Sequence, residues 1–70
     1  MKYTVILEKG RNSFAAYVPD IPGCIAVGIT EEETLILIKD SIQSHISKLQ
    51  RRGYKLPEPK SFSASIEIEK

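Results

Sequence analysis

The chain has 70 residues, of which 41% are hydrophobic and 27% charged, and its formal net charge at pH 7 is +1. This length fits one small domain, the apolar fraction excludes a disordered chain, and the weak net charge gives no electrostatic indication of nucleic-acid binding. One cysteine and one histidine exclude an internal disulfide framework and a multi-histidine metal site. No apolar run approaches the roughly 18 residues of a membrane span, and the N-terminus has no signal-peptide pattern. We therefore expect a single cytoplasmic domain over residues 1–70 that uses no cofactor.

The first half of the chain predicts three short β-strands. Residues 3–8 are rich in apolar and β-branched side chains, and residues 13–18 place apolar side chains on one face. The polar turn between them has the length of an antiparallel hairpin connection. The turn sequence PDIPG at residues 19–23 ends the second strand, because proline cannot donate to a sheet ladder. A short third strand is expected at residues 24–27.

A long amphipathic helix follows. Thr30 and Glu33 have the spacing of a capping box, and apolar residues then recur at helical spacing over four turns: Leu35, Ile38, Ile42, Ile46 and Leu49. Gly53 stands where a left-handed residue ends a helix. Both helix ends are therefore predicted from local sequence.

Residues 61–69 alternate without a break between apolar and polar side chains, which predicts a half-buried fourth strand. The element order is β-β-β-α-β, an α+β two-layer domain with one helix on a four-stranded, mainly antiparallel sheet. A right-handed crossover would place the last strand parallel to the first, in strand order 3-2-1-4. One helix leaves the second sheet face uncovered. Because so small a core is marginal alone, we expect association with a second copy or a partner.

The turn at Asp20, Ile21, Pro22, Gly23 and Cys24 is the most distinctive local feature. A proline-fixed loop could present it to a partner, although aspartate is also an ordinary turn residue that bonds its own backbone. Cys24 as a nucleophile would need a base; the single histidine, His45, lies beside the helix stripe, and packing explains both residues better. Leu37 lies away from the stripe and favours a protein contact.

A two-metal nuclease would need carboxylates converging from several elements. The expected first strand has only Glu8 at its end, the glutamates at residues 31–33 suit a helix N-terminus, and Glu67 and Glu69 belong to an outward-facing set. The carboxylates therefore do not favour a metal-dependent hydrolase.

The segments YVPDIPGC at residues 17–24 and GITEEE at residues 28–33 resemble the N-terminal domain of HicB family antitoxins, and the similarity extends over essentially the whole chain. The resemblance implies a partial ribonuclease H-like fold without nuclease activity. It also implies binding and inhibition of a HicA-like toxin, a ribonuclease that cuts mRNA. Two positions depart from the family pattern, where Ile29 replaces the usual aspartate and Thr34 the usual alanine. The chain ends at Lys70 without a DNA-binding module, so we expect no direct DNA contact and carry over no operon autoregulation.

The leading hypothesis is thus a non-enzymatic antitoxin of a type II toxin–antitoxin system. Its predicted partner-binding residues are Asp20, Ile21, Pro22, Gly23, Cys24 and Leu37. Two alternatives stay open: an orphan ribonuclease H-like domain acting as a homo-oligomeric regulatory or ligand-binding module, and a weak metal-dependent nuclease using Asp20. The sequence gives neither the toxin's identity nor the oligomeric state.

Overall fold

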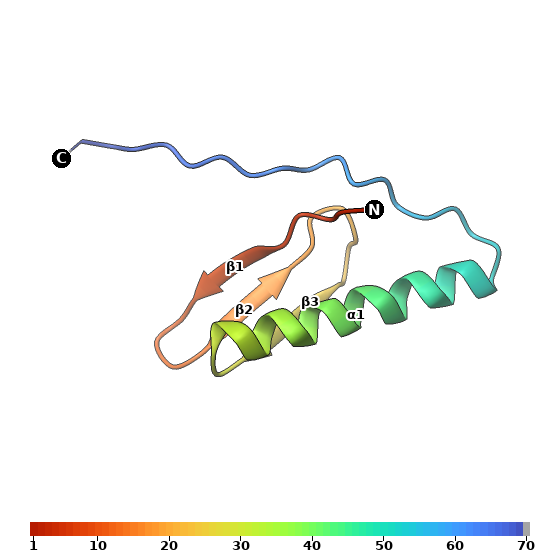
Figure 1. The fold of residues 1–70 in the computed structure, drawn as a ribbon, viewed down its shortest axis with the longest axis horizontal. Coiled ribbons are helices and arrows are strands. Elements are labelled where there is room, and N and C mark those ends of the chain that lie inside the picture. Colours follow the sequence, from red (N-terminus) through yellow and green to blue (C-terminus); the bar gives the residue numbers. More distant parts are fainter. Residues whose placement is uncertain (70) are drawn as a thin grey trace.

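The fold, taken from a computed structural model that describes residues 1–69, is a small antiparallel sheet with one long helix across it (Figure 1). The elements, in chain order, are β1 (Ile6–Lys9), β2 (Phe14–Tyr17), β3 (Ile25–Gly28) and α1 (Glu31–Arg51). The sheet order is β1-β2-β3, and α1 packs against β3 and β2. The predicted α+β class, the three N-terminal strands and the single helix are confirmed.

The core lies between α1 and the sheet. In the register of the sheet, Ala16 of β2 stands opposite Leu7 of β1 and Ala26 of β3, which places these three residues on the helix-covered face. The fully buried apolar side chains come from β2, the loop after it and α1: Ala16, Val18, Ile21, Cys24 and Ile38. We call the other side of the sheet, which carries Tyr17, Ile25 and Val27, the open face.

The N-terminus of α1 is capped as predicted. The Thr30 hydroxyl accepts a hydrogen bond from the Glu33 backbone N–H at 3.1 Å. The Glu33 carboxylate reaches back to the N–H of Ile29 at 3.1 Å, one residue earlier than the expected N–H of Thr30. These two bonds satisfy free donors at the positive end of the helix.

The C-terminus of α1 ends in a Schellman motif. The N–H of Tyr54 donates to the carbonyl of Leu49 at 2.9 Å, and the N–H of Gly53 donates to the carbonyl of Gln50 at 3.1 Å. Gly53 has a φ of +72°, a conformation that glycine adopts without a Cβ penalty. The predicted helix stop is therefore confirmed.

The predicted fourth strand is not confirmed, and neither are the four-stranded sheet and the ribonuclease H likeness. Residues 54–69 form no helix or strand, and beyond the end of α1 the chain passes the N-terminus and runs on as a single extended stretch (Figure 1). Ser61 is held by hydrogen bonds to the side chains of Thr4 and Asp20 rather than by the backbone of β1. Residues 61–69 thus have the alternating sequence of a strand but pair with no neighbouring strand among the described residues.

Candidate functional site

The loop at residues 19–24, which joins β2 to β3, is held in one shape by its own backbone. The N–H of Val18 donates to the carbonyl of Cys24 at 3.2 Å, which closes the base of the loop. The N–H of Ile21 donates to the carbonyl of Val18, and the N–H of Cys24 donates to that of Ile21, both at 3.1 Å. Gly23 has a φ of +84°, so the tight turn requires a residue that tolerates the left-handed region. The loop is therefore a preformed feature of the surface.

The side chains of this loop divide into two groups. Ile21 and Cys24 are buried in the core, whereas Pro22 and Gly23 are exposed. The Cys24 sulfur lies 3.3 Å from the hydroxyl of Ser41 on α1. Burial explains why the loop carries an isoleucine at position 21 and a cysteine at position 24, because both side chains fix the loop against the core. Of the contact residues predicted in this loop, Pro22 and Gly23 are the exposed ones.

Asp20 connects the loop to the C-terminal segment. Its carboxylate accepts hydrogen bonds from the backbone N–H and from the hydroxyl of Ser61, each at 2.8 Å. The Ser61 N–H lowers the pKa of Asp20 below its ordinary value of 3.8, and partial desolvation opposes this effect. The sequence allowed either a turn-forming aspartate or one presented to a partner. Here the carboxylate bonds a residue 41 positions away, a contact that no local pattern could indicate.

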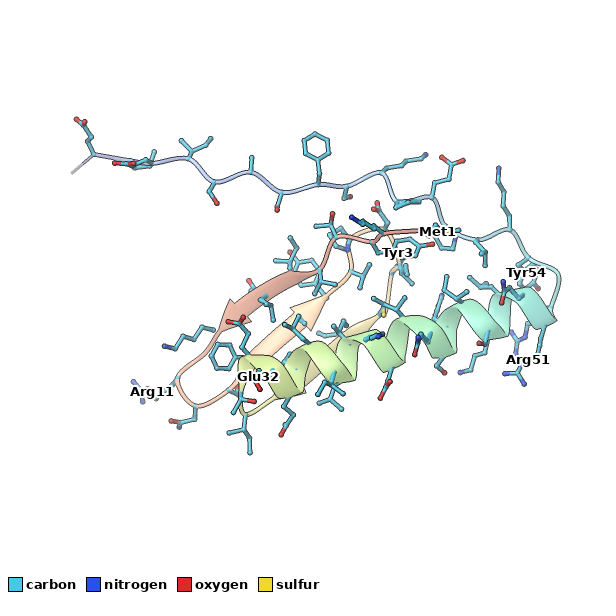
Figure 2. All side chains as sticks on the ribbon, in the orientation of Figure 1. Met1, Tyr3, Arg11, Glu32, Arg51 and Tyr54 are labelled. Atoms are coloured by element: carbon cyan, nitrogen blue, oxygen red, sulfur yellow. The ribbon has the colours of Figure 1, made fainter. Side chains whose placement is uncertain are left out.

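Two further hydrogen bonds hold the same segment across the start of the chain. The Thr4 hydroxyl donates to the carbonyl of Ser61 at 2.6 Å, and the Tyr3 hydroxyl donates to the carbonyl of Pro57 at 2.5 Å. Tyr3 lies between the sheet and the segment that follows α1 (Figure 2). Residues 57–61 are thus fastened to both the N-terminus and the β2–β3 loop.

An apolar surface extends from the loop onto the open face of the sheet. Tyr17, Ile25 and Val27 are exposed there. A surface hollow of about 360 Å³ joins Tyr17 and Ile25 to the loop residues between them. The single helix leaves this sheet face uncovered, as predicted. Within residues 24–27, the alternation of Cys24 and Ala26 with Ile25 and Val27 was the sequence signal for the exposure of the last two residues.

Leu37 lies on the same flank of α1 as Ser41. It is 40% exposed and stands one helical turn before Ser41, the residue in contact with Cys24. Residues four apart share a helix face, so Leu37 lies one turn from the contact between α1 and the loop. Ile36 is 63% exposed but points about 100° away around the helix. Leu37 therefore shares a helix face with the residue that contacts the loop, and its place in a joint contact surface stays a prediction.

The described residues do not assemble a metal site, and Cys24 lies beside a hydroxyl group. Within residues 1–69, no group of three His, Cys, Asp or Glu side chains is placed to hold a metal ion. The polar partner of Cys24 is Ser41, while His45 lies half-buried one turn further along α1. In the same part of the chain, no helix is long and apolar enough to cross a membrane.

Comparison with known proteins identifies the family. The model for the HicB-like antitoxin of bacterial toxin–antitoxin systems matches residues 3–69. The chain belongs to this family. Its membership supports an antitoxin role and a toxin partner, and it favours a regulatory rather than a catalytic protein.

Individual relatives are small proteins from distant sources. A UPF0150 protein of Thermoplasma acidophilum is 41% identical over 58 residues, covering 81% of this chain and 84% of its own length. A UPF0150 protein of Helicobacter pylori is 33% identical over 69 residues, covering 97% and 96%. A protein from the rep–hol intergenic region of Haemophilus phage HP1 is 33% identical over 57 residues, which are 81% of this chain but 43% of the phage protein. No solved structure matches the chain.

Proposed function

We propose that this HicB-like domain, residues 1–70, neutralises a HicA-like, mRNA-cleaving toxin by binding it and covering its active surface. The match of the antitoxin family model to residues 3–69 carries the proposal, because the whole described fold falls within it. This activity belongs in the cytoplasm, where such a toxin meets its mRNA substrate. The chain itself contributes no catalytic group in this proposal.

The proposed contact surface consists of the exposed part of the loop, the open face beside it and the helix flank at Leu37. Three observations support this choice. The loop is closed by three backbone hydrogen bonds, so little conformational entropy is lost when it binds. Exposed apolar side chains, Tyr17 and Ile25, continue the surface beyond the loop. Ile21 and Cys24 support this surface indirectly, because their buried side chains fix the loop against the core. Asp20 supports it by holding Ser61 in place.

A matched pair of helix variants tests this surface. Leu37→Asp places a charge on the helix flank that carries Ser41, whereas Ile36→Asp makes the same kind of change on the neighbouring solvent-facing side. Tagged wild-type chain and both variants are used to capture a HicA-like toxin from native cells, and the toxin is quantified by mass spectrometry. We expect Ile36→Asp to retain toxin as well as wild type, and Leu37→Asp to retain at least tenfold less. Circular dichroism of each variant checks that α1 is intact.

The possible outcomes separate the function from the site. If wild type retains no HicA-like toxin, the proposed function is wrong. If wild type retains toxin and both variants match it, the function stands and the assignment of Leu37 to the contact surface is wrong.

A further inference from the structure

Residues 62–69 have the side-chain pattern of a half-buried strand but are almost fully exposed. Phe62, Ile66 and Ile68 are 88%, 81% and 75% exposed, although they share one side of an alternating segment. The intervening residues are serine and glutamate. An isolated extended stretch leaves its backbone groups without strand partners and its apolar side in water, so this sequence favours pairing with a neighbouring strand. Figure 1 shows the stretch running past β1 without joining the sheet.

The way Ser61 is held directs the following residues away from the edge of their own sheet. Tyr3 and Val5 pack against the core, while Thr4 between them bonds the carbonyl of Ser61. Thr4 therefore faces the opposite side of the sheet from its two neighbours. Asp20 fixes Ser61 on this side through two more bonds. The segment thus leaves from the open-face side and not from the plane in which the free N–H and C=O groups of β1 point.

The sheet has two free edges, and charge distinguishes them. Within residues 1–69, β1 and β3 each pair with β2 alone. Glu31, Glu32 and Glu33 form the first turn of α1, and two residues separate them from the end of β3. Three cations, Lys2, Lys9 and Arg11, flank or end β1, which contains one carboxylate, Glu8, so the charge around β1 is net positive. The alternating segment carries Glu67 and Glu69, which would be repelled at the β3 edge and attracted at the β1 edge.

We propose that residues 62–69 of one copy add as a strand to the free β1 edge of a second copy, and that the exchange is reciprocal. In a two-fold arrangement, each copy donates one strand and has its own β1 edge covered by the strand of the other copy. The unpaired segment and the free edge therefore satisfy each other's backbone hydrogen bonds. The arrangement also supplies the additional apolar burial that a 70-residue core needs. This proposal does not rest on the antitoxin activity.

A fluorescent probe in the segment tests whether it docks and on which molecule. The chain contains no tryptophan, so in the Phe62→Trp variant the emission reports position 62 alone. We expect the emission to shift to shorter wavelength with rising protein concentration, over the same range in which sedimentation shows a dimer. A blue-shifted emission on a monomer would overturn the proposal, because the segment would then dock on its own chain. An emission typical of exposed indole on a dimer would overturn it as well.

A matched pair of charge variants tests the apolar side of the segment. Ile66→Asp places a charge on the side that the partner should cover, and Ser65→Asp places the same charge on the other side. We expect Ile66→Asp to raise the dimer dissociation constant at least tenfold and Ser65→Asp to change it less than threefold. Equal dimerisation of the two variants would contradict the exchange. Both variants should keep the helical signal of α1, since neither residue contributes to the core.

Discussion

Gly28, the last residue of β3, faces the first turn of α1 so closely that the contact can be tested by adding one methyl group. A Cβ atom built at Gly28 would lie 2.6 Å from the hydroxyl oxygen of Thr34, 3.0 Å from a carboxylate oxygen of Glu33 and 3.1 Å from the Thr34 nitrogen. Both Thr34 atoms are held in place by hydrogen bonds within the first turn of α1. The Thr34 hydroxyl donates to the carbonyl of Thr30 at 2.7 Å, its N–H donates to the same carbonyl at 3.0 Å, and Glu33 caps Ile29.

The Gly28→Ala variant should therefore be destabilised. Inserting one methylene into a packed site costs about 1–3 kcal/mol, while the reduced freedom of the unfolded chain returns about 0.4–1 kcal/mol. The expected net loss in free energy of unfolding is about 1–2 kcal/mol, measured by urea denaturation followed through the helical signal of α1. In a domain of this size, such a loss lowers the melting temperature by roughly 5–15 °C.

Two controls identify the clash as the cause. Gly10→Ala adds the same methyl group in a turn, where its closest contact would be an ordinary 3.4 Å. Its stability should match that of wild type or exceed it by up to about 1 kcal/mol, because the unfolded chain loses freedom there as well. Thr34→Ala removes the oxygen nearest the new methyl group, so Gly28→Ala should cost at least about 0.5 kcal/mol less in that background. An equal cost in both backgrounds, or no loss beyond that of Gly10→Ala, would refute the reasoning.

Two further predictions follow from single contacts. The lowered pKa of Asp20 means that its bonds to Ser61 contribute stability above about pH 3.8 and are lost as the pH falls through the lowered value, so the Ser61 amide NMR signal should shift on acidification. The Asp20→Asn variant should show no such transition, and an unchanged wild-type signal down to pH 2 would contradict the contact. Gly53→Ala places a Cβ at a φ of +72° and should cost about 1 kcal/mol. Thermal unfolding beside Gly10→Ala measures this cost, and equal stability of the two variants would contradict the assigned helix stop.

The features that the sequence predicted correctly are those specified by neighbouring residues. The capping residues Thr30 and Glu33 and the terminal Gly53 each act within a few positions of the helix end that they define. The three short strands are bounded by turns with their own sequence signals. The burial of Cys24 also follows locally, from its alternation with the exposed Ile25.

The features that the sequence did not predict depend on residues far apart in the chain. The alternation at residues 61–69 indicates a local preference for a strand. It does not indicate which sheet edge, or which molecule, provides the strand with which these residues pair. Ser61 is placed by Asp20 and by Thr4, which lie 41 and 57 positions earlier. Thr34 was not expected in the core, because its burial depends on the close approach of Gly28.

The antitoxin role is tested most directly by RNA cleavage with a purified HicA-like toxin from the same cells. The toxin is held at a fixed concentration, the chain is added in increasing amounts, and cleavage of an mRNA substrate is followed over time. We expect cleavage to fall in proportion to added chain and to stop at a fixed stoichiometry, with Ile36→Asp as effective as wild type and Leu37→Asp much less so. Undiminished cleavage at a large molar excess of wild-type chain would contradict the account.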